Sequence, residues 1–265
     1  MLHVVTIATH SERMFPILQE SAKRNGVPLT ILGRNHPWKD FASKMDILLP
    51  FFRSQPEEDI ICYLDGFDSL ILPPIRHLEK NFLSFGKGII FSNDYRHKGI
   101  QGFFEKKFFP DEHVFSTGIF IGKNKALQDL FLAAREMYPH DSDDQKILRR
   151  YYVHKNCAHQ TCAQMAIDRE SRLFYNFDAA EPSFNLLNQI SHIHNGELYL
   201  LNGQSPSVIS FPCSWFAIGI KKNLHILLKK LGYDYCPEIN LKGTFNGLKY
   251  YIGTSIKESL KTLLK

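Results

Sequence analysis

The chain has 265 residues, of which 44% are hydrophobic and 22% charged, and its formal net charge is +5. This length allows a sizeable buried core, and the composition is that of an ordinary globular protein rather than a disordered or fibrous one. The basic residues are scattered instead of forming one stripe, which argues against a nucleic-acid-binding protein.

The cysteines and the first residues predict a cytoplasmic protein. Five cysteines at irregular spacing are not typical of a disulfide framework. Met1 leads directly into the apolar run 4–8, with no charged segment or cleavage site before it, and no apolar run approaches membrane-spanning length. Two basic amphipathic segments, 224–231 and 256–264, leave open a weak peripheral contact with a membrane.

In chain order, short apolar runs alternate with helical patterns. The runs predict strands over 3–9, 28–33, 59–64, 70–72, 88–92, 118–122, 173–177, 198–201 and 208–211. Helices are predicted from a cap at Ser11 to Gly26, over 41–52 and 78–85, from a cap at Asn124 to Tyr138, from Asp141 onward and over 215–231, with a long loop over 94–114. We therefore expect one α/β domain with a mostly parallel central sheet flanked by helices.

The main chemical signal is the segment Cys62–Asp68, in which an apolar strand runs into two aspartates. Asp65 and Asp68 stand three residues apart across a turn that contains Gly66. Ligands of parallel sheets lie beyond the carboxyl ends of the strands, and hard divalent cations prefer oxygen ligands that phosphates can complete. An ordinary acidic turn is the alternative, because the motif is short.

Three further patterns are weaker. Asp143 and Asp144 precede a helix, where they either cap it or bind a ligand. Gly118 allows close approach of the backbone to a ligand, or merely makes a turn. The side chains of a spaced His/Cys group have the types that zinc prefers, but their spacing matches no common finger, so a polar loop is favoured. Its members are His154, Cys157, His159 and Cys162.

Taken together and in this order, these segments resemble the glycosyltransferase domain of the procollagen lysyl hydroxylases, which is of the GT-A type. The resemblance covers about residues 3 to 178. It is carried by Val5–Thr9, Leu32-Gly33 followed by Trp38, Lys44, Asp65–Asp68, Ile90–Ser92, Thr117–Gly122, Asp143–Gln145, and Ile167-Asp168 with Ser171–Asn176.

The resemblance implies a GT-A (Rossmann-like) fold and a hexosyltransferase that uses a UDP-sugar and an unknown hydroxyl acceptor on a glycan, a lipid-linked glycan or a protein. Mn²⁺ or Mg²⁺ would be bound by Asp65 and Asp68, and Asp143 and Asp144 would lie near the sugar as catalytic groups. Residues 1–265 would form a single glycosyltransferase domain, with a nucleotide-binding part at about 1–95 and an acceptor-side part at about 96–265. The donor site would comprise Thr6, Ala8, Thr9, Trp38, Lys44, Leu64, Asp65, Gly66 and Gly118.

One departure concerns the metal. The family has a late metal-binding His, whereas the corresponding segment here, Phe211–Ser214, contains none. The metal then has fewer protein ligands, Cys213 or His194 replaces the missing one, or metal binding is lost. The alternative function is accordingly a non-catalytic homologue that binds a sugar nucleotide. Nothing resembles the hydroxylase domain, so lysyl hydroxylation is not expected.

Overall fold

The computed structural model describes residues 1–94, 115–154, 164–177, 186–212 and 218–235, without the side chains of 218–222. Its central sheet has six strands in the order β2-β1-β3-β6-β5-β7. Five of them run parallel to one another, and β6 is antiparallel to both of its neighbours. The strands are β1 (Leu2–Ile7), β2 (Leu29–Leu32), β3 (Ile60–Asp65), β5 (Ile89–Asn93), β6 (Phe115–Lys123) and β7 (Met165–Asp168). This confirms the predicted α/β fold with a mostly parallel sheet.

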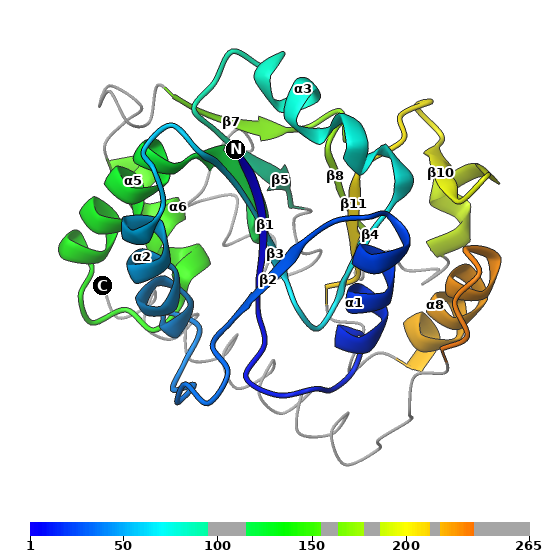
Figure 1. Cartoon of the computed structure of the whole chain (residues 1–265), viewed down its shortest axis with the longest axis horizontal. Helices are drawn as coiled ribbons and strands as arrows, with labels where there is room; N and C mark the ends of the chain where they lie inside the picture. Colours follow the sequence, from blue (N-terminus) through cyan, green and yellow to red (C-terminus); the bar gives the residue numbers. More distant parts are fainter. Residues whose placement is uncertain (95–114, 155–163, 178–185, 213–217, 236–265) are drawn as a thin grey trace, which may run out of the picture.

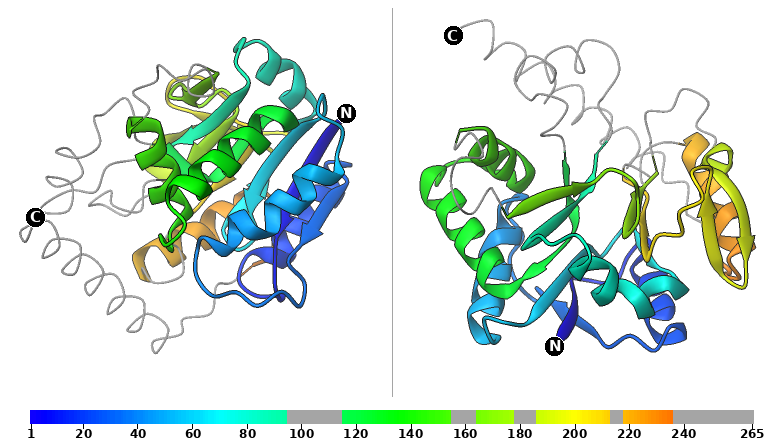
Figure 2. Two further views of the ribbon diagram at one scale, coloured as in Figure 1. Left: turned by 90° about the vertical axis from the view of Figure 1, so that its left-hand side faces the viewer. Right: turned by 90° about the horizontal axis from the view of Figure 1, so that it is seen from above.

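Both faces of this sheet are covered, as Figures 1 and 2 show. Three helices lie on one face: α2 (Ser43–Ser54), α5 (Asn124–Met137) and α6 (Asp144–His154). The other face packs against α1 (Phe15–Arg24), η1 (Pro73–His77), α3 (Leu78–Leu83) and a second sheet. That second sheet has the order β4-β11-β8, formed by β4 (Ser69–Ile71), β11 (Val208–Ser210) and β8 (Phe174–Asn176).

A third layer lies outside the second sheet (Figure 1). It contains η3 (Leu186–Gln189), the hairpin of β9 (Ile190–His194) and β10 (Glu197–Leu200), and α8 (Ile218–Lys230). Three leucines of α8 and one just after it are buried in the core, namely Leu224, Leu227, Leu228 and Leu231. This corrects the expectation that 224–231 offers an apolar face to a membrane; the segment 256–264 lies outside the described residues.

The alternation of side chains along β3 explains why this strand lies in the middle of the core. Ile61 and Tyr63 point to the helices α2, α5 and α6, while Cys62 and Leu64 point to the opposite face, and all four are at most 1% exposed. A strand that is buried on both faces reads as a continuous apolar run, as it does here. Its first polar residue, Asp65, therefore comes where the strand leaves the core.

Two predicted helix caps are wrong. Helix α1 begins at Phe15, its cap position is Met14, and Ser11 lies in the preceding loop. Asn124 begins α5 without capping it: its fully buried side-chain amide donates to the main-chain oxygens of Phe52 (2.8 Å) and Gln55 (2.8 Å) at the end of α2. These long-range hydrogen bonds compete with a local cap, and sequence spacing does not reveal them.

Other predicted boundaries hold to within a few residues, and two strands were not predicted. Strand β7 is four residues long, and β9 is a partly exposed strand of mixed polarity, so neither gives a clear periodic signal. The predicted loop over 94–114 lies, beyond Asp94, outside the described residues. Within the part of the chain that is described, no helix is long and apolar enough to cross a membrane.

Candidate functional site

The site is centred on a buried lysine that joins two segments far apart in the sequence. Lys44 is in the first turn of α2 and only 4% exposed. Its Nζ lies 2.9 Å from Asp144 Oδ2, at the start of α6, and 3.3 Å from Asp65 Oδ1, at the end of β3. It also donates to the main-chain oxygen of Thr117 on β6 at 3.3 Å. One cation thus links α2, α6, β3 and β6 at the carboxyl end of the parallel strands.

Asp65 is partly exposed, and one of its oxygens is held in place. Its side chain keeps 35% exposure, although its neighbours on β3 are buried. The Tyr63 hydroxyl donates to Asp65 Oδ1 at 2.6 Å, and Lys44 contacts the same oxygen. Among the described residues, Asp65 Oδ2 has no hydrogen-bond partner.

Asp68 lies where the central sheet passes into the second sheet. Its Oδ1 accepts hydrogen bonds from the hydroxyls of Ser69 (3.4 Å) and Ser210 (3.3 Å). Its main-chain oxygen accepts the Phe211 amide at 2.9 Å. The late segment 211–214 therefore begins beside Asp68, although Cys213 and Ser214 lie outside the described residues.

Simultaneous ionisation of Asp65 and Asp68 is unfavourable, because the pKa of each carboxyl group is raised. Burial raises the pKa of Asp68 to about 7, and the charge of Asp65 adds to the shift. Burial also raises the pKa of Asp65, against the opposing effects of Lys44 and the Tyr63 hydrogen bond. Burial alone would lower the pKa of Lys44, but Asp144 and Asp65 outweigh it and raise that pKa above its usual range. Lys44 is therefore a permanent cation between carboxylates, and a second cation near Asp68 would favour full ionisation.

The acidic segment before α6 combines capping with ligand-type groups. Asp143 Oδ1 accepts the Lys146 amide at 3.0 Å, which is the hydrogen bond of an N-cap. Asp144 faces Lys44 and is 3% exposed. Burial raises the pKa of Asp143, with a further contribution from the Asp144 charge. Gln145 Oε1 accepts the Thr117 amide at 3.2 Å, which ties α6 to β6.

Two glycines allow close approach around Asp65. A Cβ on Gly118 would lie 3.0 Å from Asp65 Oδ2, and a Cβ on Gly66 would lie 2.7 Å from the main-chain oxygen of Ile7. The same Cβ on Gly66 would lie 3.0 Å from Thr6 Oγ1, a fully buried hydroxyl that has no hydrogen-bond partner among the described residues. Larger residues at these positions would displace the carboxylate or the end of β1.

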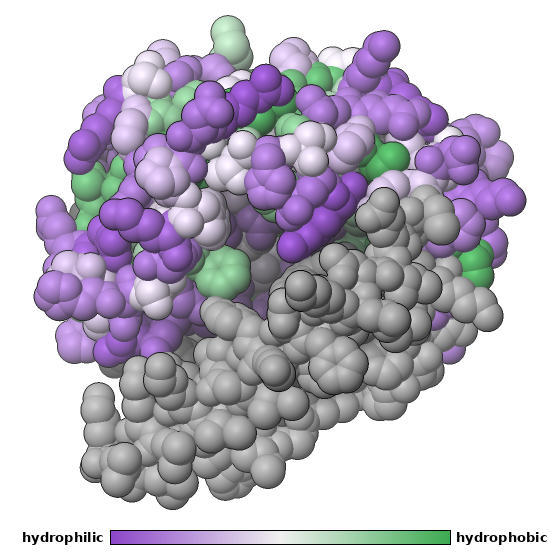
Figure 3. Space-filling view, turned by 90° about the horizontal axis from the view of Figure 1, so that it is seen from below, coloured by the Kyte–Doolittle hydropathy of each residue, from purple (hydrophilic) through white to green (hydrophobic). Residues whose placement is uncertain are grey.

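The other predicted nucleotide-binding residues divide into buried and exposed groups. Thr6, Ala8 and Leu64 are at most 1% exposed, and their main chains are engaged in the sheet, so a ligand does not reach them directly in this structure. The Thr9 hydroxyl is hydrogen bonded to His10 Nδ1 at 2.7 Å. Trp38 is 42% exposed and makes an edge-to-face contact with Phe41 in the turn before α2. Seen from below Figure 1, where β1 and β3 end, the described surface is mainly hydrophilic (Figure 3).

The chemical types of the side chains at the turn suit a hard divalent cation that also binds phosphate. Asp65 and Asp68 offer carboxylate oxygens, and Mg²⁺-type sites often use one or two carboxylates together with substrate phosphates. No group of three or more His, Cys, Asp or Glu side chains that could bind a metal occurs among the described residues. His194 therefore does not join Asp65 and Asp68, which corrects one of the alternatives for the missing ligand. In the proposed zinc group, Cys157, His159 and Cys162 lie outside the described residues.

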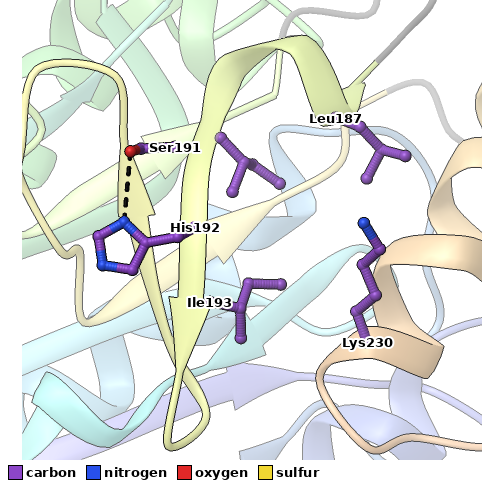
Figure 4. A pocket seen from close by; sticks show the side chains of 6 residues that line it. Leu187, Ser191, His192, Ile193 and Lys230 are labelled. Carbon is purple, nitrogen blue, oxygen red and sulfur yellow. Dashed lines mark hydrogen bonds between the residues drawn. The ribbon is translucent and has the colours of Figure 1, made fainter.

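A cavity of about 340 Å³ lies elsewhere, between η3, β9 and α8. Leu187, Ile193 and Lys230 surround it, while the His192 ring points to the other side of β9 and is hydrogen bonded to Ser191 Oγ at 3.2 Å (Figure 4). His192 also stacks on Tyr199, with ring centroids 4.4 Å apart. None of the residues predicted for the donor site lines this cavity.

Sequence reasoning missed two hydroxyls of the site. Tyr63 stands two residues before Asp65 on the same strand, and the period of two in a strand places both side chains on one face. That rule could have identified Tyr63. Ser210 carries no local signal, because it reaches Asp68 only through the pairing of β11 with β4.

Comparisons with known proteins agree with the overall fold. A family model, the PLOD GT domain, matches residues 1–209. The chain is similar in structure to a glycosyltransferase involved in the glycosylation of the major capsid of PBCV-1, with 9% identity, a TM-score of 0.50 and coverage of 86% of this chain and 98% of that one. It is also similar to the galactosyltransferase LgtC, solved with donor and acceptor sugar analogs, with 13% identity, a TM-score of 0.51 and coverage of 92% and 100%. No curated protein matches.

Proposed function

The chain belongs to the PLOD GT domain family of glycosyltransferases, and from this premise we propose that it transfers a hexose from a UDP-sugar to a hydroxyl acceptor with the help of Mn²⁺ or Mg²⁺. The observation that carries the proposal is the cluster of Asp65, Asp68, Lys44 and Asp144 at the carboxyl end of the parallel strands. Ligands of open α/β sheets bind at this end.

In this proposal Asp65 and Asp68 bind the metal ion directly, and they bind the diphosphate of the donor through that ion. A bound metal ion supplies Lewis-acid stabilisation of the diphosphate leaving group. Asp65 and Asp68 orient that group, and Gly118 leaves room next to Asp65 Oδ2. Lys44 holds Asp65 and Asp144 in fixed positions, because its ammonium contacts both carboxylates. Such preorganised charge favours the transition state without reorganisation during the reaction.

The remaining predicted residues would bind the rest of the donor. Thr9 and Gly66 at the ends of β1 and β3 would line the nucleotide, with the buried residues Thr6, Ala8 and Leu64 directly beneath them. The exposed ring of Trp38 offers an apolar face for a base or sugar. Asp143 and Asp144 would bind the hydroxyls of the hexose. We further propose one glycosyltransferase domain, in which about 1–95 binds the nucleotide and about 96–265 the acceptor, which is a glycan, a lipid-linked glycan or a protein.

Calorimetric titration of UDP, with and without Mn²⁺, tests the proposal. We expect Mn²⁺-dependent binding to the wild type and its loss in Asp65→Ala/Asp68→Ala. The control Asp46→Ala/Asp129→Ala also removes two carboxylates, but from the outer surface of α2 and α5, and should bind as the wild type does. If neither UDP nor Mn²⁺ binds to a folded wild type, the assignment is wrong.

The alternative is a non-catalytic homologue that binds a sugar nucleotide. It is favoured by the internal counterion Lys44 and by the lack of a third metal ligand among the described residues. Release of UDP from UDP-glucose or UDP-galactose needs no known acceptor and separates the two functions. Mn²⁺-dependent release supports the enzyme, whereas tight binding without release supports the binding protein.

A further inference from the structure

Each of the two carboxylates proposed to bind the metal accepts a hydrogen bond from a buried hydroxyl that has no other role in the proposed function. Tyr63 is 1% exposed and donates to Asp65 Oδ1 at 2.6 Å. Ser210 is 3% exposed and donates to Asp68 Oδ1 at 3.3 Å. In both cases the hydroxyl engages Oδ1, and among the described residues the Oδ2 atoms have no hydrogen-bond partner.

We propose that Tyr63 and Ser210 are positioning residues, which fix the two carboxylates through Oδ1 so that their Oδ2 atoms are directed to a divalent cation. This inference rests on the proposed function and deepens it. A hydrogen bond to one carboxylate oxygen limits rotation of the group and so reduces the entropy that is lost when the other oxygen binds a metal. Outer hydroxyls of this kind commonly matter for metal affinity.

The surroundings of Tyr63 separate the role of its hydroxyl from that of its ring. The ring stacks on Phe120, with centroids 5.1 Å apart, and Lys44 Nζ lies 5.3 Å from its centroid. A phenylalanine would keep both contacts and lose only the hydrogen bond to Asp65.

Ser210 performs the matching task from a different sheet. Strand β11 pairs with β4, with Ser210 opposite Ser69, and both serine hydroxyls reach Asp68 Oδ1. Ser69 begins β4 and is the chain neighbour of Asp68, whereas Ser210 ends β11 and is 142 residues away in the chain. The paired ends of these two strands therefore hold Asp68 Oδ1 from the second sheet.

The test measures Mn²⁺ affinity, by the electron paramagnetic resonance signal of the free ion, in Tyr63→Phe and Ser210→Ala. We expect each change to weaken Mn²⁺ binding about tenfold, the lower end of the range for such outer groups. The release of UDP from a UDP-sugar should then require more Mn²⁺, while its rate at saturating Mn²⁺ stays near that of the wild type. Ser210→Thr keeps the hydroxyl and should restore the affinity.

Tyr199→Phe is a matched control, because Tyr199 donates to Glu197 Oε2 at 2.9 Å, two residues away and outside the site. It should leave Mn²⁺ affinity unchanged. If the wild type binds Mn²⁺ and both site variants bind it within twofold, the positioning role is overturned and the proposed function stands. If the wild type does not bind Mn²⁺, the metal-dependent function fails and the positioning role fails with it. Should Tyr63→Phe not fold, Ser210→Ala and its threonine rescue decide alone.

Discussion

Lys44 stabilises the site as the buried counterion of two carboxylates. Its side chain is 5% exposed, and its ammonium contacts Asp144 and Asp65. Replacing Lys44 with Met keeps most of the apolar stem but leaves the buried Asp144 without a counterion. Removing one partner of a buried ion pair typically costs about 3–5 kcal/mol. We therefore expect Lys44→Met to lower the free energy of unfolding by about this amount, measured by urea denaturation at neutral pH.

The double variant Lys44→Met/Asp144→Asn provides the control. It removes the uncompensated charge together with the lysine, so most of the lost stability should return. A loss below about 1 kcal/mol in the single variant would mean that water already compensates Asp144, as at a surface ion pair.

Asp68 should give the site a pH dependence, because burial raises its pKa to about 7 and the Asp65 charge adds to the effect. An unfolded aspartate titrates at about 4, so between these values the folded state binds more protons than the unfolded one. Stability contributed by this group is thus fully present below about pH 4 and is lost as the pH rises towards about 7.

The variant Asp68→Asn removes this titration. Its free energy of unfolding should increase relative to that of the wild type as the pH rises from about 4 to about 7, measured by denaturant unfolding without metal. The same comparison with Asp129→Asn, at an exposed carboxylate on α5, should give a constant difference. Mn²⁺ affinity of the wild type should rise with pH over the same window, because the metal displaces the proton. A pH-independent difference between the wild type and Asp68→Asn would show that Asp68 is ionised throughout.

At the scale of elements, most of the fold could be predicted from the sequence, because buried strands and amphipathic helices have clear periods. The strand that ends at Asp65 is an example: five buried residues precede the first polar one. Elements that are short or supported from a distance could not be predicted. Strand β7 depends on pairing with β5, and the side chain of Asn124 is fixed by carbonyl groups at the end of α2.

The same distinction applies to the site. The pattern around Asp65 and Asp68 points to the turn, the acidic pair Asp143-Asp144 is a weaker pattern of its own, and the resemblance adds Lys44. The ion pair between Lys44 and Asp144 joins the first turns of α2 and α6, which only the packed structure brings together. No spacing within either segment encodes that contact.

Asp143 has two possible roles at the start of α6, and one pair of substitutions separates them. Asn is as good an N-cap as Asp, whereas Ala cannot accept the Lys146 amide. We expect Asp143→Ala to lower the free energy of unfolding by about 1 kcal/mol and Asp143→Asn to leave it nearly unchanged. If the carboxylate also binds the sugar, Asp143→Asn loses UDP-sugar turnover while it keeps full stability. Unchanged turnover in Asp143→Asn would leave Asp143 with the cap alone.

At the scale of the whole molecule, the turn that contains Asp65 and Asp68 joins the two sheets. Asp65 ends β3 of the central sheet, Asp68 directly precedes β4 of the second sheet, and the Phe211 amide after β11 donates to the Asp68 main chain at 2.9 Å. A ligand that fixes both aspartates therefore restricts the opening of both sheets, since local opening of either one would break the site.

Hydrogen exchange with and without UDP and Mn²⁺ measures this coupling. Ligand at about 100 times its Kd stabilises the folded state by about 2.7 kcal/mol, which slows exchange about a hundredfold wherever opening abolishes binding. We expect this protection in β1 and β3 and also in β4 and β11. The β9–β10 hairpin, which forms a separate two-stranded sheet, is the internal reference and should change least. Protection confined to the central sheet would mean that Asp68 binds no ligand group, because the second sheet could then open while the donor stays bound.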